Sequence, residues 1–104
     1  MPVQDLDKNN FNSTIEAAAK PVIVDFYADW CGPCKMIAPV MEQISKTRDD
    51  VLVYRVDVDK NPELAVQFGI MNIPTIISFK DGALYKKAVG AHGMANILKL
   101  VDSQ

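Results

Sequence analysis

The 104-residue chain lacks several features that mark particular classes of protein. It contains no run of about 18 apolar residues, which argues against a membrane-spanning helix. Its formal net charge is −2, and its basic residues do not alternate with aromatic ones, so neither a nucleic-acid surface nor a basic membrane patch is indicated. It opens without a basic or apolar leader, and a cytoplasmic location is therefore expected.

Cysteine is also scarce, because the chain has two, Cys31 and Cys34, and a single histidine, His92. A pair three positions apart closes a very short loop and would stabilise the fold little as a structural disulfide. A structural zinc ion needs four ligands, and no second cysteine pair is present to complete the set. In a reducing compartment a lone pair with this spacing favours redox chemistry. The two alternatives for this cysteine pair are half of a metal site and a pair of inert buried thiols.

What the chain does contain is the composition of one small globular domain. Hydrophobic residues make up 49% of it and charged residues 23%, which is the usual balance for a folded domain. Its length suits one domain, and neither a repeat nor a linker-like stretch divides it. We therefore expect a single domain over residues 1–104.

Hydrophobic patterns predict alternating strands and helices. Strands are expected at residues 3–6, 22–28, 51–58, 75–79 and 84–89, and helices at about 10–19, 31–48, 61–68 and 94–101. This order indicates an α/β fold, with a right-handed parallel crossover between the second and third strands. The same pattern makes the fourth strand parallel to the third. Asp81-Gly82 favours a hairpin between the last two strands.

The helix at 31–48 combines an apolar face with an internal proline. The residues expected on that face are Cys34, Ile37, Ala38, Met41 and Ile44. Pro39 should kink the helix, because proline removes one backbone hydrogen bond.

The position of the cysteine pair predicts unequal roles for its two members. Cys31 follows a buried-looking strand and begins a helix, where free N–H groups and the helix dipole favour an anion. This environment should lower the pKa of the Cys31 thiol and make it the nucleophile. Cys34 comes one helical turn later and should resolve the mixed disulfide. We therefore expect Cys31 to be exposed and Cys34 to be recessed.

Asp25 is the second unusual residue, because it interrupts an otherwise apolar strand. Burial there should raise the pKa of its carboxyl group. Two interpretations follow from the pattern: a carboxylate tolerated beside a cation, or a base that takes the proton of Cys34 when this thiol attacks.

Ile73-Pro74 lies just before the fourth predicted strand and is a candidate cis peptide bond. Apolar residues from separate segments could form a substrate rim here, namely Trp30, Met71, Ile73 and Ala91. Scattered surface hydrophobics are the alternative, since these are common on folded proteins.

Residues 24–35 resemble the active-site signature of the thioredoxin family. The resemblance continues over nearly the whole chain, at Pro39, 56–59, 69–70, 73–75, 79–82 and 89–90. It implies an α/β thioredoxin fold with a central five-stranded mixed β-sheet flanked by four α-helices. It also implies that the fourth strand runs antiparallel to the third, and that the Ile73-Pro74 bond is cis and faces the cysteine pair.

The resemblance also implies a function, the reduction of protein disulfides through a reversible Cys31–Cys34 disulfide. The oxidised form would be reduced again by a flavin-dependent, NADPH-dependent thioredoxin reductase. The domain itself would bind no cofactor and would act as a monomer, without nucleic acid or membrane as a partner.

The resemblance also implies the site residues, by their positions in the chain. Cys31 would be the nucleophile, Cys34 the resolving cysteine and Asp25 the buried acid that relays a proton. A substrate groove would be lined by Trp30, Gly32, Pro33, Ile73, Pro74, Gly90 and Ala91. A bound segment would pair its backbone with residue 73, a short form of strand addition.

Three residues depart from the common family pattern. Tyr27 replaces a frequent tryptophan, which should alter packing more than chemistry. Arg55 stands where a lysine is frequent, and its permanent charge should hold Asp25 ionised. Met71 replaces a basic residue and makes the groove less positive.

Three other functions are considered beside disulfide reduction. A disulfide oxidase or isomerase is disfavoured because such relatives commonly have histidine between the cysteines, where this chain has Gly32-Pro33. A glutaredoxin is disfavoured because Pro-Tyr is usual there. A docking module would use Trp30, Ile73 and Ala91 without any thiol turnover.

Overall fold

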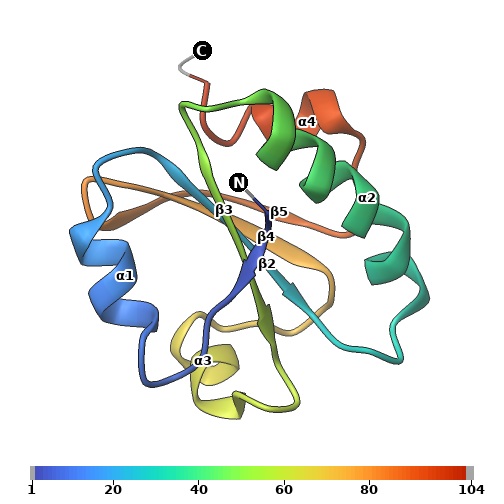
Figure 1. Cartoon of the computed structure of the whole chain (residues 1–104). Helices are drawn as coiled ribbons and strands as arrows, with labels where there is room; N and C mark the ends of the chain where they lie inside the picture. The colour runs from blue at the N-terminus through green and yellow to red at the C-terminus, as the bar shows by residue number, and fades with distance from the viewer. Residues whose placement is uncertain (1, 103–104) are drawn as a thin grey trace.

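The computed structural model describes residues 2–102 and shows alternating strands and helices. The elements are β1 (Gln4–Asp5), α1 (Phe11–Ala17), β2 (Val22–Tyr27), α2 (Gly32–Thr47), β3 (Leu52–Asp57), α3 (Pro62–Gln67), β4 (Thr75–Lys80), β5 (Ala83–Val89) and α4 (Met94–Leu98). Each lies within or close to a segment predicted from the hydrophobic pattern. The α/β order and the four flanking helices are therefore confirmed for the described residues (Figure 1).

The strands form one mixed sheet in the order β1-β3-β2-β4-β5. β1 and β2 both pair with β3 in parallel, whereas β4 pairs antiparallel with β2 and β5 antiparallel with β4. β4 therefore runs opposite to β3, and the parallel direction predicted from the pattern is wrong. The antiparallel direction implied by the family resemblance is confirmed.

The connection between β3 and β4, residues 58–74, leads the chain into β4 at the end of the sheet where β2 finishes. Thr75, the first residue of β4, pairs with Phe26 near the end of β2. β4 therefore runs back along β2, in a direction set by tertiary pairing that a local pattern does not show.

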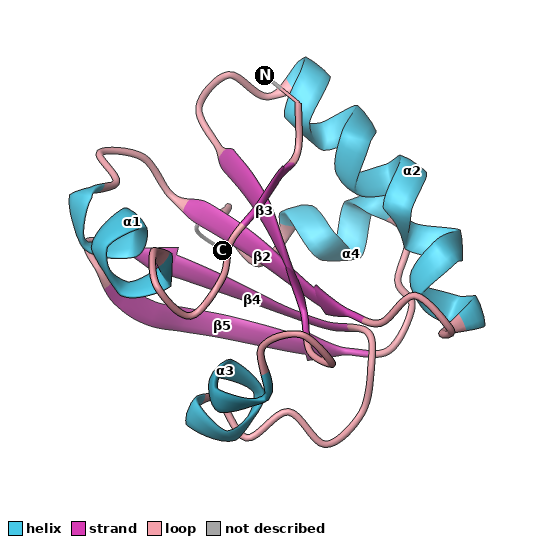
Figure 2. Cartoon of the chain, turned by 60° about the horizontal axis from the view of Figure 1, so that its bottom comes forward, coloured by secondary structure: helices cyan, strands magenta, loops and turns pink. Residues whose placement is uncertain are grey.

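Helices cover both faces of the sheet, α1 and α3 on one side and α2 and α4 on the other (Figure 2). The first side buries side chains such as Phe11, Val24 and Leu64. The second side buries Ile23 and, from the two helices, Ile37 and Ile97. Because both faces are covered, residues 22–26 of β2 are all buried, which accounts for the nearly continuous apolar sequence there.

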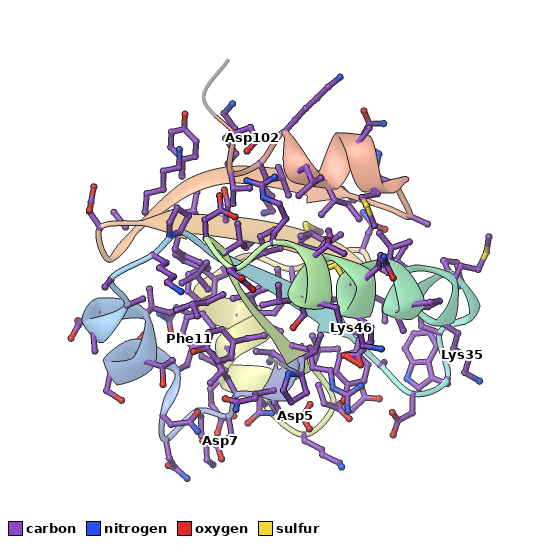
Figure 3. The ribbon with its side chains drawn as sticks, turned by 45° about the horizontal axis from the view of Figure 1, so that its top comes forward. Asp5, Asp7, Phe11, Lys35, Lys46 and Asp102 are labelled. Carbon is purple, nitrogen blue, oxygen red and sulfur yellow. A yellow bond between two sulfur atoms is a disulfide. The ribbon has the colours of Figure 1, made fainter. Side chains whose placement is uncertain are left out.

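Four phenylalanines give the α1 and α3 side much of its packing. The ring of Phe11 lies 6.3 Å from that of Phe26, 5.2 Å from that of Phe68 and 5.7 Å from that of Phe79. Phe11 therefore points inward, whereas Lys35 on α2 lies at the outer surface (Figure 3). No helix in residues 2–102 combines the length and the apolar character needed to cross a membrane.

Candidate active site

The cysteine pair lies where β2 gives way to α2. Cys31 is the N-cap of α2, and Gly32 and Pro33 form the first turn of that helix. Proline is tolerated there because the first helical N–H groups have no partner within the helix. Cys31 and Cys34 form a disulfide, with their Cα atoms 5.3 Å apart. The structure therefore shows the oxidised state.

Burial does not distinguish the two cysteines, because each is 3% exposed. The expected exposure of Cys31 is therefore wrong for this oxidised state. Both cysteines pack with Ala28, and half-buried Tyr27 and Ile73 lie against them. The residues that bury Cys31 lie outside α2, so the apolar pattern of that helix did not predict its burial.

The surroundings do distinguish the two sulfur atoms. The Sγ of Cys31 accepts a hydrogen bond from the backbone N–H of Cys34 at 3.1 Å and lies 3.8 Å from the carbonyl oxygen of Ile73. Cys34 instead lines a pocket that Asp25 also lines. In the reduced state, the N–H and the helix dipole would favour a thiolate at Cys31.

Asp25 is buried in the middle of the sheet, as predicted, with 4% of its surface exposed. Burial raises the pKa of its carboxyl group to about 7, although the charge of Arg55 acts to lower it. Arg55 therefore favours the ionised form, in the direction expected, but the cost of burying the charge has the larger effect on this pKa. Within the described residues, the Oδ1 of Asp25 has no hydrogen-bond partner.

The side chain of Arg55 contacts Asp5 and Tyr27. Its Nε donates to Asp5 Oδ1 at 2.5 Å, and its guanidinium lies 5.3 Å from the ring centre of Tyr27. No local pattern indicated Asp5 as a partner of Arg55, because the two residues are 50 positions apart. They meet because β1 pairs with β3, with Asp5 opposite Arg55.

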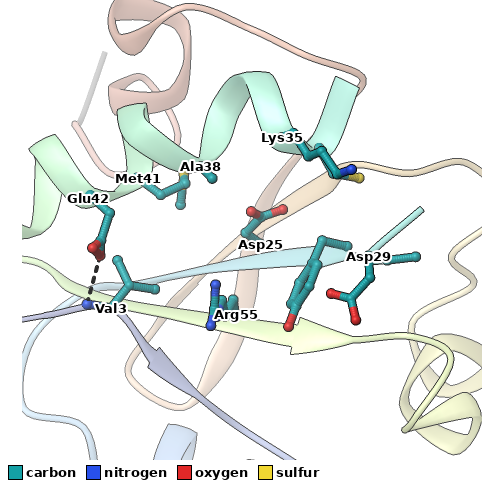
Figure 4. A pocket seen from close by; sticks show the side chains of 11 residues that line it. Val3, Asp25, Asp29, Lys35, Ala38, Met41, Glu42 and Arg55 are labelled. Atoms are coloured by element: carbon teal, nitrogen blue, oxygen red, sulfur yellow. Dashed lines mark hydrogen bonds between the residues drawn. The ribbon is translucent and has the colours of Figure 1, made fainter. Parts of the chain in front are cut away.

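A pocket of about 290 Å³ leads to Asp25 and Cys34. Its walls come from β2, β3 and α2 and from the segment before β1, and Figure 4 shows Asp25 and Arg55 projecting into it from neighbouring strands. Ala38, predicted on the buried face of α2, is exposed and lines this pocket. Glu42 closes one side, since its Oε1 accepts a hydrogen bond from the N–H of Val3 at 3.2 Å. Sequence reasoning missed this pocket because its residues are far apart along the chain.

Among the predicted groove residues, those of the turn before β4 lie closest to the disulfide in the recorded packing. The Ile73-Pro74 bond is cis, as predicted, and Ile73 packs against both cysteines. The backbone N–H of Gly90 donates to the carbonyl of Pro74 at 2.8 Å, which places Gly90 beside this turn. Gly32, Pro33 and Ala91 are exposed.

Two large exposed hydrophobic residues lie in the segments predicted to form the groove. Trp30 is 71% exposed, and its Nε1 donates to Asp59 Oδ2 at 2.8 Å, a contact that sequence reasoning did not predict. Met71, two residues before Ile73, is 90% exposed.

Metal ligation receives no support from the side chains that the structure describes. In residues 2–102, no group of three or more histidine, cysteine or acidic residues is arranged to hold a metal ion. Asp57 has a structural role instead, since its Oδ1 accepts hydrogen bonds from the N–H groups of Asp59 and Lys60.

The geometry agrees with comparisons to known proteins. The sequence profile of the family described as Thioredoxin matches residues 2–103. A thioredoxin of Mycobacterium tuberculosis is 50% identical over 91 residues, which are 86% of this chain and 78% of the relative. A bifunctional thioredoxin reductase/thioredoxin of Mycobacterium leprae is 48% identical over 91 residues, which are 86% of this chain and 20% of that protein.

A solved structure extends the likeness to three dimensions. The thioredoxin of Malassezia sympodialis aligns with a TM-score of 0.84 and 40% identity, over 96% of this chain and 91% of that one. The profile match, these relatives and the Cys31–Cys34 disulfide at the start of α2 lead to one assignment. The chain belongs to the thioredoxin family and is a dithiol–disulfide oxidoreductase.

Proposed function

We propose that this chain is a general reductant of protein disulfides in which Cys31 attacks and Cys34 resolves. The observation that carries the proposal is the different setting of the two sulfur atoms. Cys31 Sγ accepts the N–H of Cys34 and lies beside the Ile73 carbonyl, whereas Cys34 lines the pocket of Asp25. A nucleophile needs stabilisation of its thiolate, and a resolving thiol needs a base to take its proton.

The reaction then takes two exchange steps. The Cys31 thiolate attacks one sulfur of the substrate disulfide, forms a mixed disulfide and expels the other sulfur as a thiolate. Cys34 gives its proton to the Asp25 carboxylate and attacks Cys31 Sγ, which releases the second substrate thiolate. Two electrons pass to the substrate, and the Cys31–Cys34 disulfide seen in the structure is the product.

Asp25 suits the second step because burial brings its pKa to about 7. A base with a pKa near the working pH can both accept a proton and give it up again. The pocket that Asp25 shares with Cys34 supports transfer between them, directly or through one water molecule.

The substrate segment would lie across the turn that precedes β4. Strand addition to the backbone at Ile73 would place a substrate disulfide beside Cys31, whose Sγ is 3.8 Å from the Ile73 carbonyl oxygen. The remaining walls of this groove would be Trp30, Gly32, Pro33, Pro74, Gly90 and Ala91.

We further propose that an NADPH-dependent thioredoxin reductase regenerates the dithiol, and that the domain works as a cytoplasmic monomer without a bound cofactor. The Mycobacterium leprae relative supports the choice of reductase, because its name joins thioredoxin reductase and thioredoxin in one protein. Disulfide-containing proteins are the substrates, and neither nucleic acid nor membrane is needed for the reaction.

The test is the reduction of insulin disulfides in the presence of a thioredoxin reductase and NADPH. We expect steady NADPH consumption with the wild-type chain and none with Cys31→Ser. No turnover by the wild type, or undiminished turnover by Cys31→Ser, contradicts the proposal. A strongly oxidising potential in equilibrium with glutathione would favour a disulfide oxidase instead.

A further inference from the structure

Three charged residues form a row across one face of the sheet. Asp5 of β1 is opposite Arg55 of β3, and Arg55 is opposite Asp25 of β2. Residues in register on neighbouring strands direct their side chains to the same face. One guanidinium therefore lies between two carboxyl groups, of which Asp25 is buried and Asp5 is exposed.

Arg55 is bonded to the exposed carboxylate. Its Nε lies 2.5 Å from Asp5 Oδ1, and a second guanidinium nitrogen lies 3.5 Å from Asp5 Oδ2. Tyr27 holds the same guanidinium from the side, with its ring centre 5.3 Å away. Asp25 Oδ1, in contrast, has no hydrogen-bond partner in the part of the chain that the structure describes.

We propose that Asp5 is a positioning residue, which holds the Arg55 guanidinium away from Asp25 and so limits its attraction on that carboxylate. The inference rests on the proposed function of Asp25 as the base for Cys34. Asp5 acts through Arg55, because it contacts Arg55 and does not line the pocket of Asp25. If Asp5 is lost, Arg55 keeps its charge and is free to turn toward the buried carboxylate.

The Asp5–Arg55 ion pair should affect the proton affinity of Asp25 more than it affects the stability of the fold. The side chains of Arg55 and Asp5 are 45% and 63% exposed, and exposed ion pairs add little to the stability of a fold. A cation acts far more strongly on a buried carboxylate, because little water screens it there. Burial already raises the pKa of Asp25 and Arg55 opposes this effect, so the position of Arg55 sets the balance.

Other ionisable groups also surround Asp25, and each must be considered. They are Tyr27 and Asp29 at the end of β2, Arg55 on β3, and Cys34, Lys35 and Glu42 on α2. β4 contributes the uncharged Ile76 opposite Asp25. Asp5 differs from these groups because changing it leaves the pocket wall intact.

The experiment is a carboxyl NMR titration of Asp25 in the oxidised protein. In Asp5→Asn we expect the pKa of Asp25 to fall by about one pH unit, the lower end of the effect of a nearby opposite charge. Asp5→Glu should leave the pKa of Asp25 near its wild-type value, because glutamate keeps a carboxylate at this position. Arg55→Gln should raise the pKa, and Asp5→Asn should have no further effect in that background. Thermal unfolding of each variant confirms that it folds.

Asp49→Asn is the matched control, since it removes one exposed negative charge from the turn after α2. An unchanged Asp25 pKa in Asp5→Asn overturns the inference, and so does an equal fall in Asp49→Asn. A second measurement separates this inference from the proposed function. If the Asp25 pKa falls in Asp5→Asn while the pH profile of mixed-disulfide resolution stays in place, Asp5 does tune Asp25, but Asp25 is not the base.

Discussion

At the scale of single residues, the proposed resolving step depends on the buried carboxyl group of Asp25. Two effects oppose each other there, because burial disfavours the ionised form while the charge of Arg55 favours it. Burial has the larger effect, and the pKa rises to about 7. The carboxyl group can therefore change its protonation state near neutral pH, where thiol–disulfide exchange takes place.

This balance predicts how Asp25→Asn changes stability with pH. The folded state keeps the Asp25 proton up to a pH of about 7, whereas the unfolded chain, in which the carboxyl has its ordinary pKa of 3.8, has already released it. As the pH rises from about 4 to 7, the wild type should therefore lose up to about 4 kcal/mol of unfolding free energy through this group. Asp25→Asn should be more stable than the wild type at pH 8 and less dependent on pH. Urea unfolding at pH 5 and pH 8 measures both values, and equal stabilities at pH 8 would contradict the predicted burial cost.

The same residue predicts a kinetic effect on the resolving step. Release of the substrate from the mixed disulfide should slow as the pH falls through 7, because Asp25 becomes protonated and no longer accepts the Cys34 proton. Asp25→Asn should slow release on the order of 10²-fold at pH 8 and remove this pH dependence. Stopped-flow measurement of product release gives the rates. Asp57→Asn is the control, a buried carboxyl on β3 that should leave the profile in place.

Sequence reasoning predicted the burial of Asp25 but not what surrounds it. A carboxyl within an apolar strand is visible in the sequence, because strand periodicity shows what lies on each side. The bond from Arg55 to Asp5 depends on the register of β1 against β3, which no local pattern gives. The exposure of Ala38 depends likewise on the pocket beside α2, which the helical pattern does not reveal.

At the scale of elements, the connection from β3 to β4 determines where the site forms. After α3 the chain enters β4 at the end of the sheet where β2 finishes. The turn at Ile73-Pro74 thereby lies against the cysteine pair at the start of α2. The local pattern of strands and helices predicted a parallel β4, because it does not show at which end of the sheet the chain enters that strand. The family resemblance was needed to predict the antiparallel direction.

The β4–β5 hairpin gives a prediction at this scale. Asp81 and Gly82 have φ angles of 54° and 79°, as the predicted two-residue turn requires. A Cβ at Gly82 would meet Glu16 Cα at 3.7 Å, an ordinary contact, so the cost of Gly82→Ala lies in the backbone. We expect a loss of about 1–2 kcal/mol of unfolding free energy, measured by urea unfolding.

Gly93→Ser is the matched comparison. Gly93 is the N-cap of α4 with a φ of −74°, and a Cβ there would have open space. Serine is favoured at N-caps, so this change should leave stability equal or slightly higher. An equal loss in both variants would show that the positive φ of Gly82 is not the cause.

At the scale of the whole molecule, one sheet joins two hydrophobic clusters. β2 contributes Val24 to the cluster beneath α1 and α3, and Ile23 to the cluster beneath α2 and α4. Since the strands are shared, loss of packing on either face should weaken the entire domain. The site itself combines the end of β2, the start of α2 and the turn before β4, and this assembly was predicted by the family resemblance.

Two core truncations test this shared stability. Phe11→Ala removes a ring from the α1 and α3 side, and Ile97→Ala removes the buried side chain of α4. Each should cost about 2–5 kcal/mol, and each should lower the unfolding midpoint seen by far-ultraviolet circular dichroism and by Trp30 fluorescence equally. Separate midpoints for the two signals would show that the two faces unfold independently.

The central proposal is that Cys31 attacks the substrate disulfide and Cys34 resolves the mixed disulfide. Trapping of the mixed disulfide tests it most directly. Reduced Cys34→Ser and Cys31→Ser are each mixed with a disulfide-bonded protein substrate, and the covalent adducts are measured by mass spectrometry. Cys34→Ser should accumulate a stable adduct at Cys31, because attack occurs and resolution does not, whereas Cys31→Ser should form little. An adduct that forms as fast at Cys34 in the Cys31→Ser variant, or the absence of an adduct in Cys34→Ser, would contradict the assignment of Cys31 as the nucleophile.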